Sequence, residues 1–107
     1  MQINIDSSVE KFIQDLDNIV IAKTLRTIDL LEKFGNQLGM PHSKKVTKEF
    51  FELRVRGKQE IRIFYCFKKN TIYLIHGFVK KTQKTPAKEL QHAKNKFDQL
   101  TQYNHID

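Results

Sequence analysis

Arginine and lysine side chains recur in the second half of the chain at spacings that could bring them together. Arg54 and Arg56 alternate with apolar residues in one stretch, and Arg62 does so in the next. Lys80 and Lys81 directly follow a third apolar stretch. If these stretches are neighbouring strands, alternate side chains share a face, so we expect the cations to cluster on an open sheet face. Guanidinium groups pair with phosphate oxygens, which predicts a phosphate-bearing ligand.

Further basic and aromatic residues surround this predicted cluster. The expected rim consists of Lys44, Lys45, Lys48 and Lys84. Phe50 and Phe64 alternate in phase with the arginines, so their rings either stack on nucleobases or are buried under a C-terminal helix. Solvated charges also keep small proteins soluble. Like charges that face one another across strands are destabilising, which favours a ligand that neutralises them.

The positive charge belongs to one part of the chain. Residues 1–43 carry four basic and six acidic side chains, whereas residues 44–96 carry fifteen basic and four acidic ones, in a chain of 107 residues with net charge +7. Such a field attracts phosphate polymers, although it would also suit an anionic membrane or an acidic protein. The charge distribution is therefore consistent with binding to nucleic acid, but it does not distinguish nucleic acid from a membrane or an acidic protein.

Other catalytic chemistries find little support. The sequence has no glycine-rich phosphate loop, no serine in an elbow motif and no pair of acids on a predicted sheet face. A single cysteine, Cys66, excludes an internal disulfide and a multi-cysteine zinc site. The histidines lack metal-ligand spacing, so we expect neither a metal nor another cofactor; they are His42, His76, His92 and His105.

His76 allows two interpretations. It lies in an apolar stretch, where alternation would place it on the same face as Leu74 and Phe78. A partly buried histidine with satisfied hydrogen bonds is the favoured interpretation. A role as a base or as a contact for nucleic acid is the alternative.

The first half of the chain predicts a helical hairpin after a short strand at residues 2–5. Ser7 precedes Glu10 by three residues, the spacing of a capping box. A second helix is predicted to end at Phe34, before Gly35. Its expected apolar stripe consists of Ile21, Leu25, Ile28, Leu31 and Phe34.

The second half predicts strands and a final helix. Alternation indicates strands over residues 51–55, 60–67 and 71–79, joined by short turns as an antiparallel meander. Thr85 and Pro86 are typical of a helix start, and apolar residues continue at helical spacing to Leu100. The result is a single α+β domain, residues 1–107, with its helices on one sheet face. Lacking a leader or a long apolar run, it is expected to be cytoplasmic, with no membrane partner.

Three strings give the chain a resemblance to a known family. They are F-E-L-R-V-R-G at 51–57, I-R-I-F-Y at 61–65 and L-I-H-G-F-V-K-K-T-Q-K-T-P at 74–86. Together they resemble the RelE superfamily, and within it the HigB-like branch that includes phage-derived host-killing proteins. The predicted hairpin that ends in L-L-E-K-F-G at 30–35 fits as well, so the resemblance extends over nearly the whole chain.

The resemblance implies the toxin of a type II toxin-antitoxin system, an endoribonuclease that cuts messenger RNA on the ribosome. Arg62 is similar in position to the family's arginine on the middle strand, with Arg54 and Arg56 on the strand before it. Lys80 and Lys81 resemble the basic pair after the last strand. No tyrosine near the end clearly matches the one that some members use, and Tyr103 is the remaining candidate. The implied partner is an antitoxin, often a helix-turn-helix DNA-binding protein.

The expected chemistry is metal-independent attack by a ribose 2′-hydroxyl on the adjacent phosphate. Arg62 and Arg54 would stabilise the growing negative charge. Lys80 or Lys81 would transfer the proton, because lysines among other cations lose protons more readily. Arg56, Lys45, Lys48, Lys84, Phe64 and His76 complete the expected RNA contacts. On this basis Arg62→Ala should abolish growth arrest and leave the fold intact.

Two other functions fit the same sequence. A ParE-like relative would inhibit DNA gyrase without cutting RNA, and a plain RNA-binding protein would bind without cleavage.

Overall fold

The computed structural model describes the backbone of residues 1–103 and the side chains of residues 1–100. Within that part, the strands form one five-stranded sheet in the order β1-β5-β4-β3-β2. The elements are β1 (Gln2–Ile5), α1 (Ser7–Gln14), α2 (Asn18–Phe34), the 3-10 turn η1 (Gly35–Gln37), β2 (Ser43–Lys45), β3 (Phe51–Val55), β4 (Ile61–Lys68), β5 (Thr71–Val79) and α3 (Ala87–Tyr103). The predicted α+β fold is confirmed.

The sheet contains the predicted meander and extends it at both edges. β3, β4 and β5 pair antiparallel in sequence order. β1 adds to β5 in parallel, with Gln2 opposite Thr71. β2 pairs with β3 at the other edge. The sequence did not predict β2, because three residues in a lysine-rich stretch after a turn show no strand alternation.

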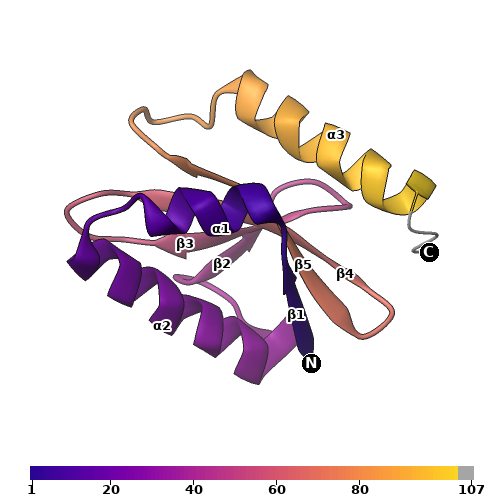
Figure 1. Ribbon diagram of the computed structural model, residues 1–107, viewed down its shortest axis with the longest axis horizontal. Helices are drawn as coiled ribbons and strands as arrows, with labels where there is room; N and C mark the ends of the chain where they lie inside the picture. The colour runs from indigo at the N-terminus through magenta and orange to yellow at the C-terminus, as the bar shows by residue number, and fades with distance from the viewer. Residues whose placement is uncertain (104–107) are drawn as a thin grey trace.

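Helices cover both faces of the sheet, which corrects the prediction that they share one. In the described part of the chain, buried side chains form two clusters. One joins α1 and α2 to inward residues of the sheet, such as Leu53, Ile63 and Leu74. The other lies under α3, where Phe64 and Phe97 belong to the same cluster. Figure 1 shows α3 set apart from α1 and α2 across the sheet. β4 is buried on both faces, because residues 61–66 are all covered.

An irregularity in β5 changes which residues share a face. Phe64 pairs with His76 while Tyr65 pairs with Leu74, so Ile75 is the extra residue. Such a bulge reverses the alternation on one strand. Leu74 therefore packs in the cluster of α1 and α2, whereas His76 stacks on Phe78 at 5.9 Å between ring centroids, on the α3 side. The prediction that Leu74 and His76 share a face is wrong.

The helix ends lie close to where the sequence predicted them, with a difference of one residue at the start of α1. The N-cap of α1 is Asp6, whose carboxylate accepts a hydrogen bond from the Ser8 backbone N at 3.0 Å. Ser7 is the first helical residue instead of the cap. Gly35 ends α2 with φ of +56°, a conformation that L residues rarely adopt.

The buried face of α2 differs from its predicted stripe. Leu25 and Phe34 are 47% and 45% exposed, whereas Ile28 and Leu31 are buried. Thr24 is fully buried, and its hydroxyl donates to the Val20 carbonyl at 2.8 Å. Threonine hydroxyls satisfied within the helix let this face pack on the sheet, which the apolar pattern alone could not indicate. Among the described residues, no helix has the length and apolar character needed to span a bilayer.

Candidate functional site

The predicted cations meet at one end of the sheet. Arg54 and Arg62 are direct cross-strand partners on β3 and β4. An open depression of about 710 Å³ is lined by both of them. We call it the main depression, and its further lining residues are Arg56, Glu60, Lys80, Lys81, Thr82 and Gln83. The structure thus places these side chains around one depression.

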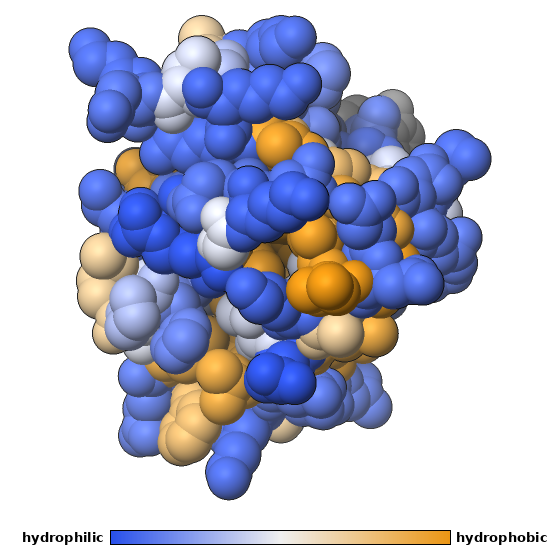
Figure 2. Space-filling model, turned by 90° about the vertical axis from the view of Figure 1, so that its left-hand side faces the viewer, coloured by the Kyte–Doolittle hydropathy of each residue, from blue (hydrophilic) through white to orange (hydrophobic). Residues whose placement is uncertain are grey.

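The surroundings of the main depression are strongly hydrophilic. The loops that follow β3 and β5 lie at the left-hand end in Figure 1. Figure 2 views the molecule from that end and shows mainly hydrophilic residues, with a smaller apolar area among them. This end of the molecule therefore offers a polar surface for a charged ligand.

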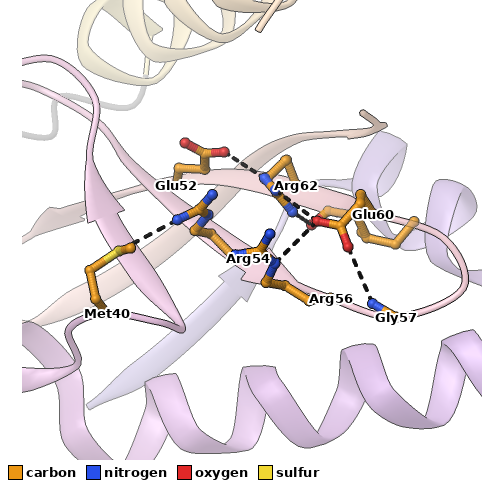
Figure 3. Close-up of polar contacts among 8 residues, drawn as sticks. Met40, Glu52, Arg54, Arg56, Gly57, Glu60 and Arg62 are labelled. Atoms are coloured by element: carbon orange, nitrogen blue, oxygen red, sulfur yellow. Dashed lines mark hydrogen bonds and ion pairs between the residues drawn. The ribbon is translucent and has the colours of Figure 1, made fainter. Parts of the chain in front are cut away.

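Arg62 is buried, which corrects the prediction of an open sheet face. Its side chain is only 2% exposed and is held on three sides. Nε lies 2.7 Å from Glu52 Oε1 as an ion pair without the alignment of a hydrogen bond. Nη2 donates to Glu60 Oε1 at 3.0 Å (Figure 3). Nη1 donates to the Ile61 carbonyl, also at 3.0 Å. Arg62 thus forms the back wall of the main depression.

Arg54 keeps unused hydrogen-bonding capacity. It is half-buried, and Nη1 donates at 3.5 Å to the sulfur of Met40, a weak acceptor (Figure 3). Its Nε is buried and finds no hydrogen-bond partner among the described residues. Buried donors are nearly always satisfied in folded proteins. Arg54 is therefore the arginine of this site that is best prepared to bind an anion.

Glu60 links the other two arginines. Its Oε1 lies 3.0 Å from Arg62 Nη2 and 3.4 Å from Arg56 Nε, and its Oε2 accepts from the Gly57 backbone N at 3.3 Å. Burial opposes ionisation of Glu60, but these hydrogen bonds and the two guanidinium charges outweigh it and lower its pKa. Glu60 is therefore a fixed negative charge that orients Arg56 and Arg62.

The two acids of this site were not predicted from the sequence, which indicated no pair of acids on a sheet face. Glu52 lies on the same face as Arg54 by strand alternation and is buried. Glu60 immediately precedes β4. Alternation of Glu52 with Phe51 and Leu53 was the signal available, but the pairing with Arg62 depends on register.

A second depression continues the cationic surface toward β2. It has a volume of about 290 Å³ and shares Arg54, Lys80 and Gln83 with the main depression. We call it the side depression, and the lysines that line it are Lys44, Lys45, Lys80 and Lys84. Lys48 is exposed between β2 and β3. The predicted rim thus lies beside the main depression, apart from Lys48, which lines neither depression.

Phe64 and His76 lie under α3 and not at the cationic surface. Phe64 is fully buried, with its ring 5.4 Å from that of Phe78. It therefore has no free face on which a base could stack, and the prediction that it contacts RNA is corrected. His76 is partly buried, and its Nε2 lies 2.8 Å from Glu89 Oε1, which confirms the interpretation of a satisfied histidine. Tyr103 ends α3, but its side chain lies outside the described side chains.

The fold and the site define a small α+β protein that carries a cationic depression on a mixed sheet. The chain belongs to the family of phage-derived Gp49-like proteins (DUF891), whose model matches residues 11–98. These are RelE-like, toxin-like proteins of toxin-antitoxin systems. The matched range includes every residue that lines the two depressions. A comparison with curated proteins found no match.

Proposed function

We propose that this chain is the toxin of a type II toxin-antitoxin pair, of the HigB-like branch, and that it cleaves messenger RNA on the ribosome. The observation that carries the proposal is the main depression, where cations from β3, from β4 and from the loops that follow β3 and β5 surround a space open to solvent. Arg54 lines it, and its Nη1 has only the Met40 sulfur as a described side-chain acceptor. A phosphodiester would supply stronger acceptors for this guanidinium.

The proposed reaction uses the RNA's own nucleophile. The ribose 2′-oxygen bonds to the adjacent phosphorus, and the bond from phosphorus to the 5′-oxygen breaks. The products are a 2′,3′-cyclic phosphate and a free 5′-hydroxyl. One protein group accepts the 2′-hydroxyl proton and another protonates the leaving oxygen, so the step requires no metal ion.

The geometry supports a division of roles among the cations. Arg54 is assigned to the phosphate oxygens, where charge grows in the transition state. Arg62 is a positioning residue, because its donors are already engaged by Glu52, Glu60 and the backbone. Lys80 and Lys81 line the same depression and are assigned to proton transfer.

The remaining cations are proposed to hold the RNA backbone. Arg56 lines the main depression and is exposed, while Lys45 and Lys84 line the side depression. Successive phosphates could follow this surface from one depression to the next. Lys48 would contact RNA beyond the side depression. His76 is not among the proposed RNA contacts, because it lies under α3 and pairs with Glu89.

The test is to induce the chain in cells and to map RNA ends by primer extension on translated messages. Cleavage predicts new ends with 5′-hydroxyls that depend on translation and lie at codon-linked positions. DNA breaks without such ends would identify a gyrase inhibitor instead. RNA binding without new ends would identify a non-catalytic protein, and either result would overturn the proposal.

We also propose that an antitoxin, with a helix-turn-helix DNA-binding domain, is encoded beside this chain. Co-expression of the neighbouring gene should restore growth and remove the new RNA ends. A neighbour that neither binds the chain nor restores growth would contradict this part.

A further inference from the structure

Three side chains with metal-binding atoms meet where α3 crosses the sheet. His76 comes from β5, and Glu89 and His92 come from α3. Each offers one ligand atom, and these atoms all lie within 4.8 Å of one another. The His76 and His92 rings are edge to face, with centroids 5.2 Å apart. We call these three residues the His-Glu-His cluster.

The fold explains why these residues meet although they are far apart in sequence. The bulge at Ile75 turns His76 toward α3. Glu89 and His92 are three residues apart, which places both on one side of a helix. The histidine spacing along the chain gave no indication of such a cluster, because its members are joined only by helix packing.

We propose that the His-Glu-His cluster binds a divalent transition-metal ion such as Zn²⁺. Two imidazole nitrogens and one carboxylate oxygen are ligands that Zn²⁺ accepts, with a water in the fourth position. At metal-ligand distances of about 2.0–2.2 Å, tetrahedral ligand atoms lie about 3.3 Å apart. His76 Nε2 and Glu89 Oε1 are 2.8 Å apart, so a small separation of the two would admit the ion.

The surroundings allow an ion to enter. His92 is exposed, whereas His76 and Glu89 are 16% and 15% exposed. A depression of about 330 Å³ adjoins the cluster and is lined by both histidines, Ser8, Asn95, Lys96 and Gln99. The Lys96 ammonium would repel a cation, but it lies 3.1 Å from Asp6 Oδ2. That carboxylate offsets its charge.

A bound ion would brace α3 against β5. Without it, the hydrogen bond between His76 and Glu89 and the ring contact between His76 and His92 join β5 to α3 at this point. The site lies apart from the residues that line the two depressions, so this inference does not depend on the proposed function. RNA cleavage need not change when the metal is removed.

The test is a Zn²⁺ titration of the purified full chain after treatment with a chelator. Calorimetry should detect one Zn²⁺ per chain, whereas Mg²⁺, which prefers oxygen ligands, should give no binding. His92→Ala and Glu89→Gln should each weaken Zn²⁺ binding at least about tenfold. His42→Ala, which removes a histidine elsewhere, should bind like the wild type.

Thermal unfolding provides a second readout. Saturating Zn²⁺ should raise the melting temperature of the wild type by at least about 5 °C, and the same Zn²⁺ concentration should raise that of His92→Ala by less. Because His92 is exposed, this variant should fold without the metal, and its melting temperature in chelator verifies that. Absence of Zn²⁺ binding by the wild type, or wild-type affinity in His92→Ala, would overturn the proposal.

Discussion

Arg54 and Arg62 face each other across two strands, yet their surroundings are opposite. Arg62 is buried and pairs with two carboxylates. Arg54 is half-buried and retains an unpaired Nε. Residue type and alternation are the same for both, so the difference comes from their neighbours. One arginine supports the site and the other is available to a ligand.

Arg54→Ala should remove activity with little effect on stability. Loss of one donor to a developing oxyanion lowers catalytic rates by about 100- to 1,000-fold, so RNA cleavage should fall by that range. The free energy of unfolding should change by less than about 1 kcal/mol, because the side chain has few partners. Arg26→Ala on α2 is the matched control. If the Arg54 variant cleaved at the wild-type rate, its assignment to the phosphate would be wrong.

Arg62 should matter for folding first, contrary to the expectation from sequence. Arg62→Met would leave the Glu52 carboxylate buried without its partner, which destabilises by about 3–5 kcal/mol. Denaturant unfolding measures this loss. The double variant Glu52→Leu with Arg62→Met should recover part of the stability, because an apolar pair replaces a buried ion pair. Equal stability of Arg62→Met and the wild type would refute the structural role.

At the scale of elements, the packing of α3 on the second face of the sheet is the main feature that the sequence did not predict. It covers the second face of the sheet, buries Phe64 and brings Glu89 and His92 over His76. Lys96 of α3 also reaches Asp6, the cap of α1. This contact joins α3 to the start of α1.

The Asp6 contacts predict a dependence of stability on pH. Burial opposes ionisation of Asp6, but hydrogen bonds from Ser8 and Lys96 outweigh it and lower the pKa below 3.8. A lowered folded-state pKa gives stability that is present above pH 3.8 and is lost as the pH falls through the folded value. Asp6→Ala should therefore be less stable by about 1 kcal/mol at pH 7. Chemical denaturation at pH 7 and pH 2.5 checks this, and an equal deficit at both values would exclude the mechanism.

At the scale of the whole molecule, positive charge is concentrated where the depressions lie. Residues 44–96 contain fifteen of the nineteen basic side chains. The cations that line the two depressions all come from this segment. The acidic first half of the chain supplies α1 and α2 on the opposite sheet face. Eight of these fifteen basic side chains therefore gather around the two depressions.

Binding of single-stranded RNA should weaken with salt according to the cations around the depressions. Each neutralised phosphate contributes about −0.7 to the slope of log affinity against log salt concentration. Lys44→Ala with Lys45→Ala should reduce the magnitude of the slope by up to about 1.4. Fluorescence anisotropy with a short RNA measures it, and Lys11→Ala with Lys94→Ala is the control. The same reduction in the control would indicate non-specific attraction.

The sequence by itself determined the elements other than β2, and the gathering of cations, because both depend on local periods. Alternation around Arg54 and Arg62 fixed their shared face, and Gly35 fixed the end of α2. Tertiary structure decided the rest. Helix packing on a second face buried Phe64, strand register brought Glu52 to the buried Arg62, and the bulge at Ile75 turned His76 toward α3. These contacts join residues distant in the chain, and no local period of the sequence specifies which distant partners will meet.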